Sequence, residues 1–163
     1  MTQATPPRAT LAHLRYPACL VALGFGAGLS PVWPGTVGAA LAFPLFLFMQ
    51  SWSPAASTTV LTVLAMIGTI ACGRACRILG AQDHPQVVWD ETVGQLLVLL
   101  AVPESWPWWL AAFIAFRVFD IVKPWPVRLA DVYATGGAAV MLDDCIAAFQ
   151  SIMLLRLIHG FTG

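Results

Sequence analysis

The chain has 163 residues, a length that suits one compact domain rather than two. Hydrophobic residues make up 59% of it and charged residues only 10%, whereas ordinary soluble domains have roughly 25% charged residues. Eight acids and eight bases are too few to cover a surface in water, so the composition indicates a protein that resides in lipid. The net charge of zero and the lack of a basic run argue against a nucleic-acid partner.

The N-terminal region is expected to lie outside the membrane core. Residues 1–15 are predicted to be a disordered or interfacial tail, and residues 16–163 a single helical membrane domain. The apolar run at 18–29 lacks the features of a cleaved signal peptide. Gly24 and Gly26 interrupt this run, which is too short to span a bilayer. It is therefore predicted to be a re-entrant or interfacial segment.

Five longer apolar stretches follow in the chain. They run over residues 37–49, 57–73, 87–102, 106–119 and 137–158. A helix rises about 1.5 Å per residue, so crossing a core of about 30 Å takes roughly 20 residues, and several stretches fall short of that. Strands are not expected, because alternation is absent and open sheet edges are not viable in lipid. The sequence predicts an all-α integral membrane bundle of about four to five short helices plus the N-terminal segment.

Basic residues gather on one side of these predicted helices. Arg74 and Arg77 follow the second stretch and three further bases flank the end of the fourth, whereas the two opposite loops contain none. By the positive-inside rule, the N-terminus and the loops at 74–90 and 117–136 are expected to be cytoplasmic. Most of the polar motifs described below then face the same side of the membrane.

Acidic residues are concentrated in one part of the chain, with all eight between residues 83 and 144. A carboxylate in or near hydrocarbon costs at least a few kcal/mol, so a partner or a function must hold it there. Asp90 and Glu91 open an apolar helix, and the helix dipole accounts for one acid better than for two. Gly94, one turn further on, leaves room for another helix or a ligand.

Arg117, Asp120 and Lys123 are spaced by three residues and share one helix face. One interpretation is a local ion-pair ladder at the end of the helix. The other is a phosphate site, in which the two bases bind phosphate oxygens and the carboxylate binds a metal. Thr36 belongs to a Pro/Gly loop that opens a helix, where its hydroxyl group and nearby amides suit a phosphate.

Asp143 and Asp144 are adjacent within an otherwise apolar stretch that offers no base near them. Uncompensated carboxylates in such a helix indicate a divalent cation. Hard oxygen ligands favour Mg²⁺, Mn²⁺ or Ca²⁺ over zinc.

With these segments identified, the sequence resembles the phosphatidylglycerophosphatase A family of bacterial membrane lipid phosphatases. Four ordered motifs carry the resemblance and span residues 23–149, nearly the whole chain. They are Pro34-Gly-Thr-Val-Gly38, Asp90-Glu-Thr-Val-Gly94, Phe116-Arg-Val-Phe-Asp-Ile-Val-Lys-Pro-Trp-Pro126, and Gly136-Gly with Met141-Leu-Asp-Asp144. In the last motif this chain has Ala139 and Ala148 where the family tends to have Gly, and neither change touches a chemical group.

The resemblance implies Mg²⁺-dependent hydrolysis of phosphatidylglycerophosphate to phosphatidylglycerol and phosphate, by a multi-pass protein of the bacterial inner (cytoplasmic) membrane. The resemblance implies that the metal is bound by Glu91, Asp120, Asp143 and Asp144. It implies that the catalytic residues are Asp90, Asp120, Asp143 and Asp144, with Asp90 either a further metal ligand or the base for water. The phosphate would be bound by Thr36, Arg117 and Lys123. Both attack by water and a covalent aspartyl-phosphate stay open.

Other classes of membrane protein also use buried acids. A small transporter or ion-binding protein is the main alternative, but a transporter predicts acids spread through the depth of the membrane. A CDP-alcohol phosphotransferase is a further alternative, and the segment around Asp143 and Asp144 lacks its signature. Nothing in the sequence indicates an oligomeric state.

Overall fold

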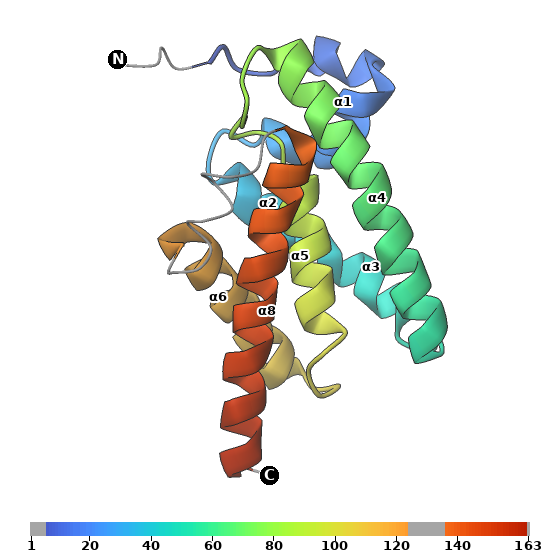
Figure 1. Cartoon of the computed structure of the whole chain (residues 1–163), viewed down its shortest axis with the longest axis vertical. Coiled ribbons are helices and arrows are strands. Elements are labelled where there is room, and N and C mark those ends of the chain that lie inside the picture. The colour runs from blue at the N-terminus through green and yellow to red at the C-terminus, as the bar shows by residue number, and fades with distance from the viewer. Residues whose placement is uncertain (1–5, 124–135, 163) are drawn as a thin grey trace.

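A computed structural model describes residues 6–123 and 136–162 of the chain, and every regular element in these ranges is a helix. The short helix α1 lies near one end of the long axis and the C-terminal end of α8 at the other (Figure 1). The all-α prediction is therefore confirmed. Asp131 and the prolines at 124 and 126 lie outside the described residues.

Three short helices form the N-terminal segment. They are the 3₁₀-helix η1 (Leu11–Arg15), the α-helix α1 (Pro17–Ala22) and the 3₁₀-helix η2 (Gly24–Leu29). The chain turns at Gly24, Phe25 and Gly26, whose φ angles are 55°, 54° and 108°. Glycine adopts such left-handed backbone at little cost, so the helix breaks where glycines interrupt the apolar run. Helix η1 falls within the predicted tail, and the division of the chain at residue 15 stays a prediction.

The five longer apolar stretches all form helices, and the first of them is divided in two. The elements are α2 (Pro34–Ala40), α3 (Ala42–Met49), α4 (Pro54–Leu79), α5 (Trp89–Leu99), α6 (Trp106–Val122) and α8 (Gly137–Thr162). Proline begins α2 and α4 and lies in the first turn of α6, where its missing N–H breaks no hydrogen bond. Helix α4 ends at Gly80, whose φ of 75° is a common helix terminator.

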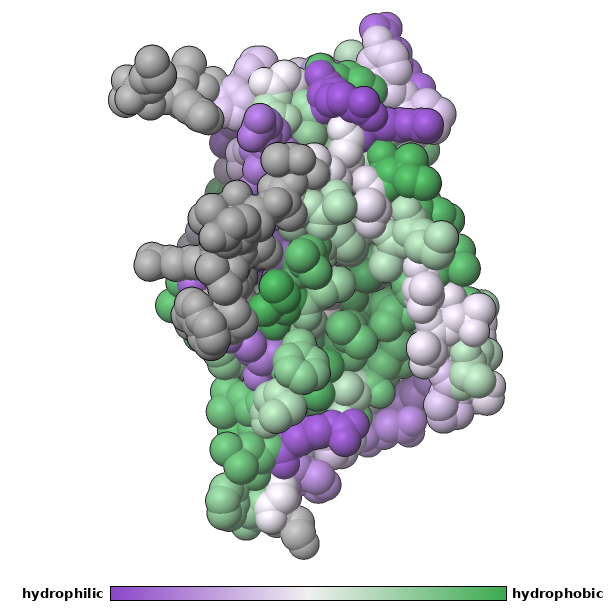
Figure 2. All heavy atoms as spheres, in the orientation of Figure 1, coloured by the Kyte–Doolittle hydropathy of each residue, from purple (hydrophilic) through white to green (hydrophobic). Residues whose placement is uncertain are grey.

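Two of the described helices, α4 and α8, are long and apolar enough to cross a membrane. Each has 26 residues, which rise about 39 Å and exceed a hydrocarbon core of about 30 Å. Only 22% of the apolar window of α4 and 39% of that of α8 are buried, unlike the core helices of soluble proteins. Hydrophobic side chains cover the middle of the face shown in Figure 2, and hydrophilic ones gather toward its ends. The fold is a helical membrane bundle.

Helix α5 lies at the centre of this bundle and contacts α1, α2, α3, α4, α6 and α8. The Thr92 hydroxyl donates a hydrogen bond of 2.8 Å to the Gly38 carbonyl of α2. A Cβ at Gly94 would lie 2.8 Å from the Phe116 ring of α6 and 3.2 Å from the Asp144 Cβ of α8. The missing side chain at Gly94 therefore lets both helices approach, as its position one turn after Asp90 predicted.

The start of α8 packs directly on the backbone of α4. A Cβ at Gly137 would lie 2.0 Å from the Thr69 carbonyl oxygen and 2.6 Å from the Gly73 nitrogen. Small residues allow such close approach between membrane helices. This contact holds the first turn of α8 in place, and thereby positions the acidic residues that follow on the same helix.

Hydrogen bonds tie the segment before α5 to the N-terminal region. Gln86 is buried; its side-chain oxygen accepts from the Ala9 amide at 2.7 Å, and its nitrogen donates to the Gly28 carbonyl at 2.9 Å. Nε2 of the buried His84 donates to the Pro7 carbonyl at 3.1 Å. These bonds link three separate stretches of chain just before the acid pair at the start of α5.

Candidate active site

A cavity of about 950 Å³ lies between α2, the segment before α5, the start of α5, α6 and α8. All eight residues that the sequence assigned to a site line it. They are Thr36, Asp90, Glu91, Arg117, Asp120, Lys123, Asp143 and Asp144. Residues more than 100 positions apart in sequence thus meet at one place, and the roles assigned to them stay predictions.

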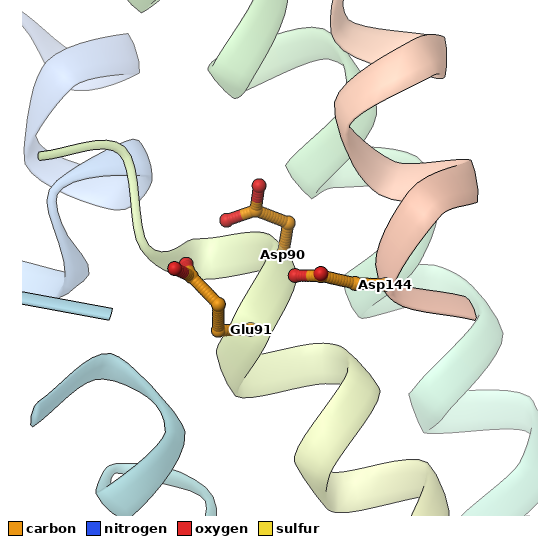
Figure 3. Close-up of side chains that lie close together, drawn as sticks. All are labelled: Asp90, Glu91 and Asp144. Atoms are coloured by element: carbon orange, nitrogen blue, oxygen red, sulfur yellow. The ribbon is translucent and has the colours of Figure 1, made fainter. Parts of the chain in front are cut away.

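Three carboxylates form a close group within this cavity, here named the carboxylate cluster. Asp90 and Glu91 come from the first turn of α5, and Asp144 points toward them from α8 (Figure 3). One oxygen of each lies within 4.8 Å of one oxygen of the other two. Asp90 and Asp144 are 6% and 4% exposed, so the cluster is shielded from water. Since the three acids repel one another when ionised, a positive charge placed among them would stabilise their ionised forms.

Part of the carboxylate cluster has no hydrogen-bond partner among the residues that the structure describes. The atoms concerned are Asp90 Oδ1, Glu91 Oε2 and Asp144 Oδ2. A buried oxygen that has lost its water without gaining a partner destabilises the fold. Carboxylate oxygens are the ligands that Mg²⁺ and Ca²⁺ prefer. The donor set and its unsatisfied oxygens therefore fit a hard divalent cation.

Arg117 and Lys123 both line the cavity, and each is paired with an acid. Arg117 Nη1 lies 2.5 Å from Asp120 Oδ2 on the same helix. Lys123 Nζ forms an ion pair with Asp143 Oδ2 of α8. The pair of Arg117 and Asp120 is the ion pair along one helix face that their spacing of three residues predicted. The second pair links the end of α6 to α8, across a sequence separation of 20 residues.

Glycine at position 35 makes room for the contact between α2 and the carboxylate cluster. A Cβ there would lie 2.3 Å from Glu91 Oε1 and 3.2 Å from Arg117 Nη2. Gly35 is buried and lines the cavity beside Thr36. The Pro-Gly-Thr motif therefore brings backbone, rather than a side chain, against an acid and a base of the site.

The carboxylate cluster is not the same set of residues as the predicted metal ligands. Two of the predicted ligands, Glu91 and Asp144, belong to the carboxylate cluster. The other two, Asp120 and Asp143, line the same cavity and form ion pairs with Arg117 and Lys123, respectively. Asp90, predicted as a further ligand or a base, is the third member of the carboxylate cluster.

Sequence reasoning missed part of the cavity wall. Trp33, Ile114, Val118 and Ile121 line the cavity although they are apolar and exposed. The last three lie on the same helix as Arg117, and their spacing of four and three residues places them on one face. That spacing was the available indication, but in an apolar helix it is hard to tell from an ordinary lipid-facing stripe.

Fold and cavity together define a helical membrane protein with a buried polar site built on carboxylates. Comparison with known proteins defines the group more closely: the chain belongs to the phosphatidylglycerophosphatase A family, whose sequence pattern matches residues 20–159. The resemblance seen in the motifs is thereby confirmed, and the chain is an enzyme of the phosphatase class.

Three relatives share 38% identity with this chain. The phosphatidylglycerophosphatase A of Escherichia coli (strain K12) aligns over 85% of this chain and 81% of its own length. That of Haemophilus influenzae aligns over 88% and 89%, respectively. A Bacteroides thetaiotaomicron protein, named as a candidate phosphatidylinositol-3-phosphatase, aligns over 88% and 94%. No solved structure matches the chain.

Proposed function

We propose that this protein is a Mg²⁺-dependent lipid phosphatase that converts phosphatidylglycerophosphate to phosphatidylglycerol and phosphate. Family membership and the names of two relatives support the substrate. The observation that carries the chemistry is the meeting of the carboxylate cluster with Arg117 and Lys123 in one cavity. Acids suited to a cation and bases suited to a phosphate are what hydrolysis of a phosphomonoester needs.

In this proposal the carboxylate cluster holds the cation. Oxygen ligands come from Asp90, Glu91 and Asp144. The ligand set is completed by Asp120 and Asp143, which line the same cavity. When bound, Mg²⁺ stabilises the charge that develops on the phosphoryl oxygens. Oxygens without a protein partner in the described parts of the chain support this assignment.

The bases hold the phosphate in this proposal. Arg117 presents a planar set of donors that matches two phosphate oxygens, and Lys123 adds a second positive charge. Their pairing with Asp120 and Asp143 keeps both side chains at the cavity before substrate arrives. Thr36 lines the same wall, and its hydroxyl group donates a further hydrogen bond.

The reaction breaks the bond between phosphorus and the glycerol oxygen. In the direct route, the oxygen of a water molecule attacks phosphorus and Asp90 accepts a proton of that water. The departing glycerol oxygen takes up a proton from solvent water, and Asp90 later returns its own proton to solvent. In the covalent route, a carboxylate oxygen of a cavity aspartate attacks phosphorus and displaces the glycerol oxygen, which takes up a proton from solvent; water then attacks phosphorus of the aspartyl-phosphate and releases phosphate. Borohydride reduces an aspartyl-phosphate to homoserine, so homoserine at a cavity aspartate position after quenching during turnover would identify the covalent route.

We also place the protein in the bacterial inner membrane, with the cavity on the cytoplasmic side. Arg74 and Arg77 lie near the end of α4, and the segment that follows them, which includes Gln82 and Asp83, lines the cavity. The positive-inside rule assigns that end to the cytoplasm.

The purified protein in detergent provides the test. It is expected to release phosphate from phosphatidylglycerophosphate with Mg²⁺, and EDTA is expected to abolish the release. Loss of a ligand that stabilises the transition state by several kcal/mol means that Asp144→Asn should lower kcat/KM by roughly 100-fold or more. Glu104→Gln, at an exposed residue outside the cavity, serves as the control and should keep full activity.

Substrate choice is tested by comparing phosphatidylglycerophosphate with phosphatidic acid and a soluble phosphomonoester. No phosphate release from any of them, together with cation uptake into vesicles, would contradict the enzyme and favour the transporter. Near-normal turnover by Asp144→Asn would remove the carboxylate cluster from the mechanism.

A further inference from the structure

The cavity that holds the carboxylate cluster has side chains of two kinds at its openings. A side chain that lines a cavity and is also exposed lies at a mouth of that cavity. Gln82, Asp83 and Pro85, from the segment after α4, form one such set, named the polar mouth. The second set, named the apolar mouth, consists of Trp33, Ile114, Val118, Ile121 and Val122.

The apolar mouth follows one face of α6. Ile114, Val118 and Ile121 are spaced by four and three residues, so they lie above one another along the helix. Trp33 directly precedes α2 and also lines the cavity. The exposed fractions of the five side chains range from 51% to 76%, which is far more than a wall closed by packing would leave.

The chemistry of the apolar mouth points to hydrocarbon rather than water. Four of its members are aliphatic, and none of the five carries a charge. Large apolar side chains grouped around a hollow mark a ligand or membrane surface. In a helical membrane bundle, such a mouth opens sideways into the bilayer, whereas Gln82 and Asp83 mark an opening to water.

The inner end of the apolar mouth meets the charged part of the site. Arg117 is on α6 between Ile114 and Val118, and Lys123 follows Val122 directly. Both bases line the same cavity. A ligand that fits this cavity therefore needs an anionic head group, which contacts Arg117 and Lys123, and an apolar chain, which extends along α6.

We infer that the apolar mouth is an acyl-chain groove: a diacyl lipid with a phosphomonoester head reaches the carboxylate cluster sideways from the bilayer, with a chain lying along Ile114, Val118 and Ile121. The polar mouth admits water and releases phosphate. This inference rests on the proposed function, which requires an anionic lipid. It explains how the head reaches a buried cluster while the chains stay in hydrocarbon.

A kinetic experiment tests the groove with a bulky substitution. Val118→Trp fills the apolar mouth, and Leu110→Trp is the matched control, since Leu110 is an exposed residue of α6 that does not line the cavity. Each protein is assayed on dioleoyl and dihexanoyl phosphatidylglycerophosphate. A steric obstacle along the chain should lower the dioleoyl to dihexanoyl ratio of kcat/KM by roughly tenfold or more in Val118→Trp, and the ratio should not change in Leu110→Trp.

Equal losses on both substrates in Val118→Trp, or an unchanged ratio, would overturn the groove. If the unsubstituted protein releases phosphate from neither substrate, the proposed function fails instead. The two failures are therefore distinct.

Photolabelling provides a second measurement that does not depend on turnover. Phosphatidic acid with a diazirine in one acyl chain is irradiated with the unsubstituted protein in detergent, and the labelled peptides are mapped. Label is expected on residues 114–121 of α6 in excess over the exposed apolar residues of α4, such as Val63 and Met66. Competition by dioleoyl phosphatidylglycerophosphate should remove that excess. Equal labelling of α6 and α4 would overturn the groove.

Discussion

At the scale of single residues, Gly35 shows how closely the site depends on an absent side chain. The position is buried between Glu91 and Arg117, which come from two other helices. A methyl group at 2.3 Å from a carboxylate oxygen cannot be accommodated without displacing that carboxylate. The geometry of the carboxylate cluster therefore depends on α2 as well as on the helices that carry the acids.

Gly35→Ala is accordingly expected to lower kcat/KM for phosphatidylglycerophosphate by roughly 10- to 100-fold, the range found when a residue that orients a metal ligand is lost. Gly160→Ala is the control, because a Cβ at Gly160 would meet nothing within 4 Å. Phosphate release is measured alongside the circular dichroism of both proteins. Unchanged activity in Gly35→Ala would contradict the positioning of Glu91 by this contact.

At the scale of elements, the segment that leads into α5 is held by Gln86. Its amide group joins the N-terminal stretch at Ala9 to η2 at Gly28, and both bonds are buried. A Cβ at Gly28 would lie 2.0 Å from the Gln86 carbonyl oxygen, so backbones also pack closely here. The start of α5, and with it the acid pair, is thereby fixed to parts of the chain that contribute no acid.

Gln86→Ala leaves the Ala9 amide and the Gly28 carbonyl without their partner. The free energy of unfolding should fall by about 1–3 kcal/mol for buried groups left unsatisfied. Thermal unfolding in detergent checks this, with Gln82→Ala as the control at an exposed position four residues earlier. Equal melting temperatures for the two variants would show that the bonds at Gln86 add no stability.

At the scale of the whole molecule, a cation at the carboxylate cluster would join α5 to α8. Binding to the folded state alone stabilises it by about 2.7 kcal/mol when the ligand is at 100 times its Kd. For a chain of this size that corresponds to a rise in melting temperature of roughly 5 °C or more. Mg²⁺ is therefore expected to raise Tm, and NaCl at equal ionic strength is not. The same Tm rise in Asp144→Asn would contradict binding at the cluster.

Much of this fold could be predicted because lipid restricts what a sequence can do. Apolar stretches in lipid must form helices, and an acid within such a stretch needs a partner or a function. The acidic residues of the cavity could therefore be identified from the sequence. The pairing within the cavity could not be predicted. Lys123 meets Asp143 only because α6 and α8 pack together, and Asp144 reaches Asp90 because Gly94 leaves room for α8. Such contacts depend on how helices cross, which spacing along one helix does not encode.

The length of α4 illustrates a different difficulty. Its apolar stretch ends near residue 73, but the helix continues through Arg74 and Arg77 to Leu79. Arginine is a good helix former, so a helix can continue past the end of its apolar stretch. The end of the apolar stretch marks where the helix leaves the lipid, not where the helix stops. In the structure the helix stops before Gly80, which has left-handed backbone with φ 75°.

Six other helices in the described part of the chain surround α5, and this has a consequence for how the protein works. A shift of α5 as a rigid body would open gaps on every side at once, so the helix that carries the acid pair is the part least able to move. For the lipid substrate proposed above, we therefore expect binding and release to displace the cavity walls formed by α2 and α6 rather than α5.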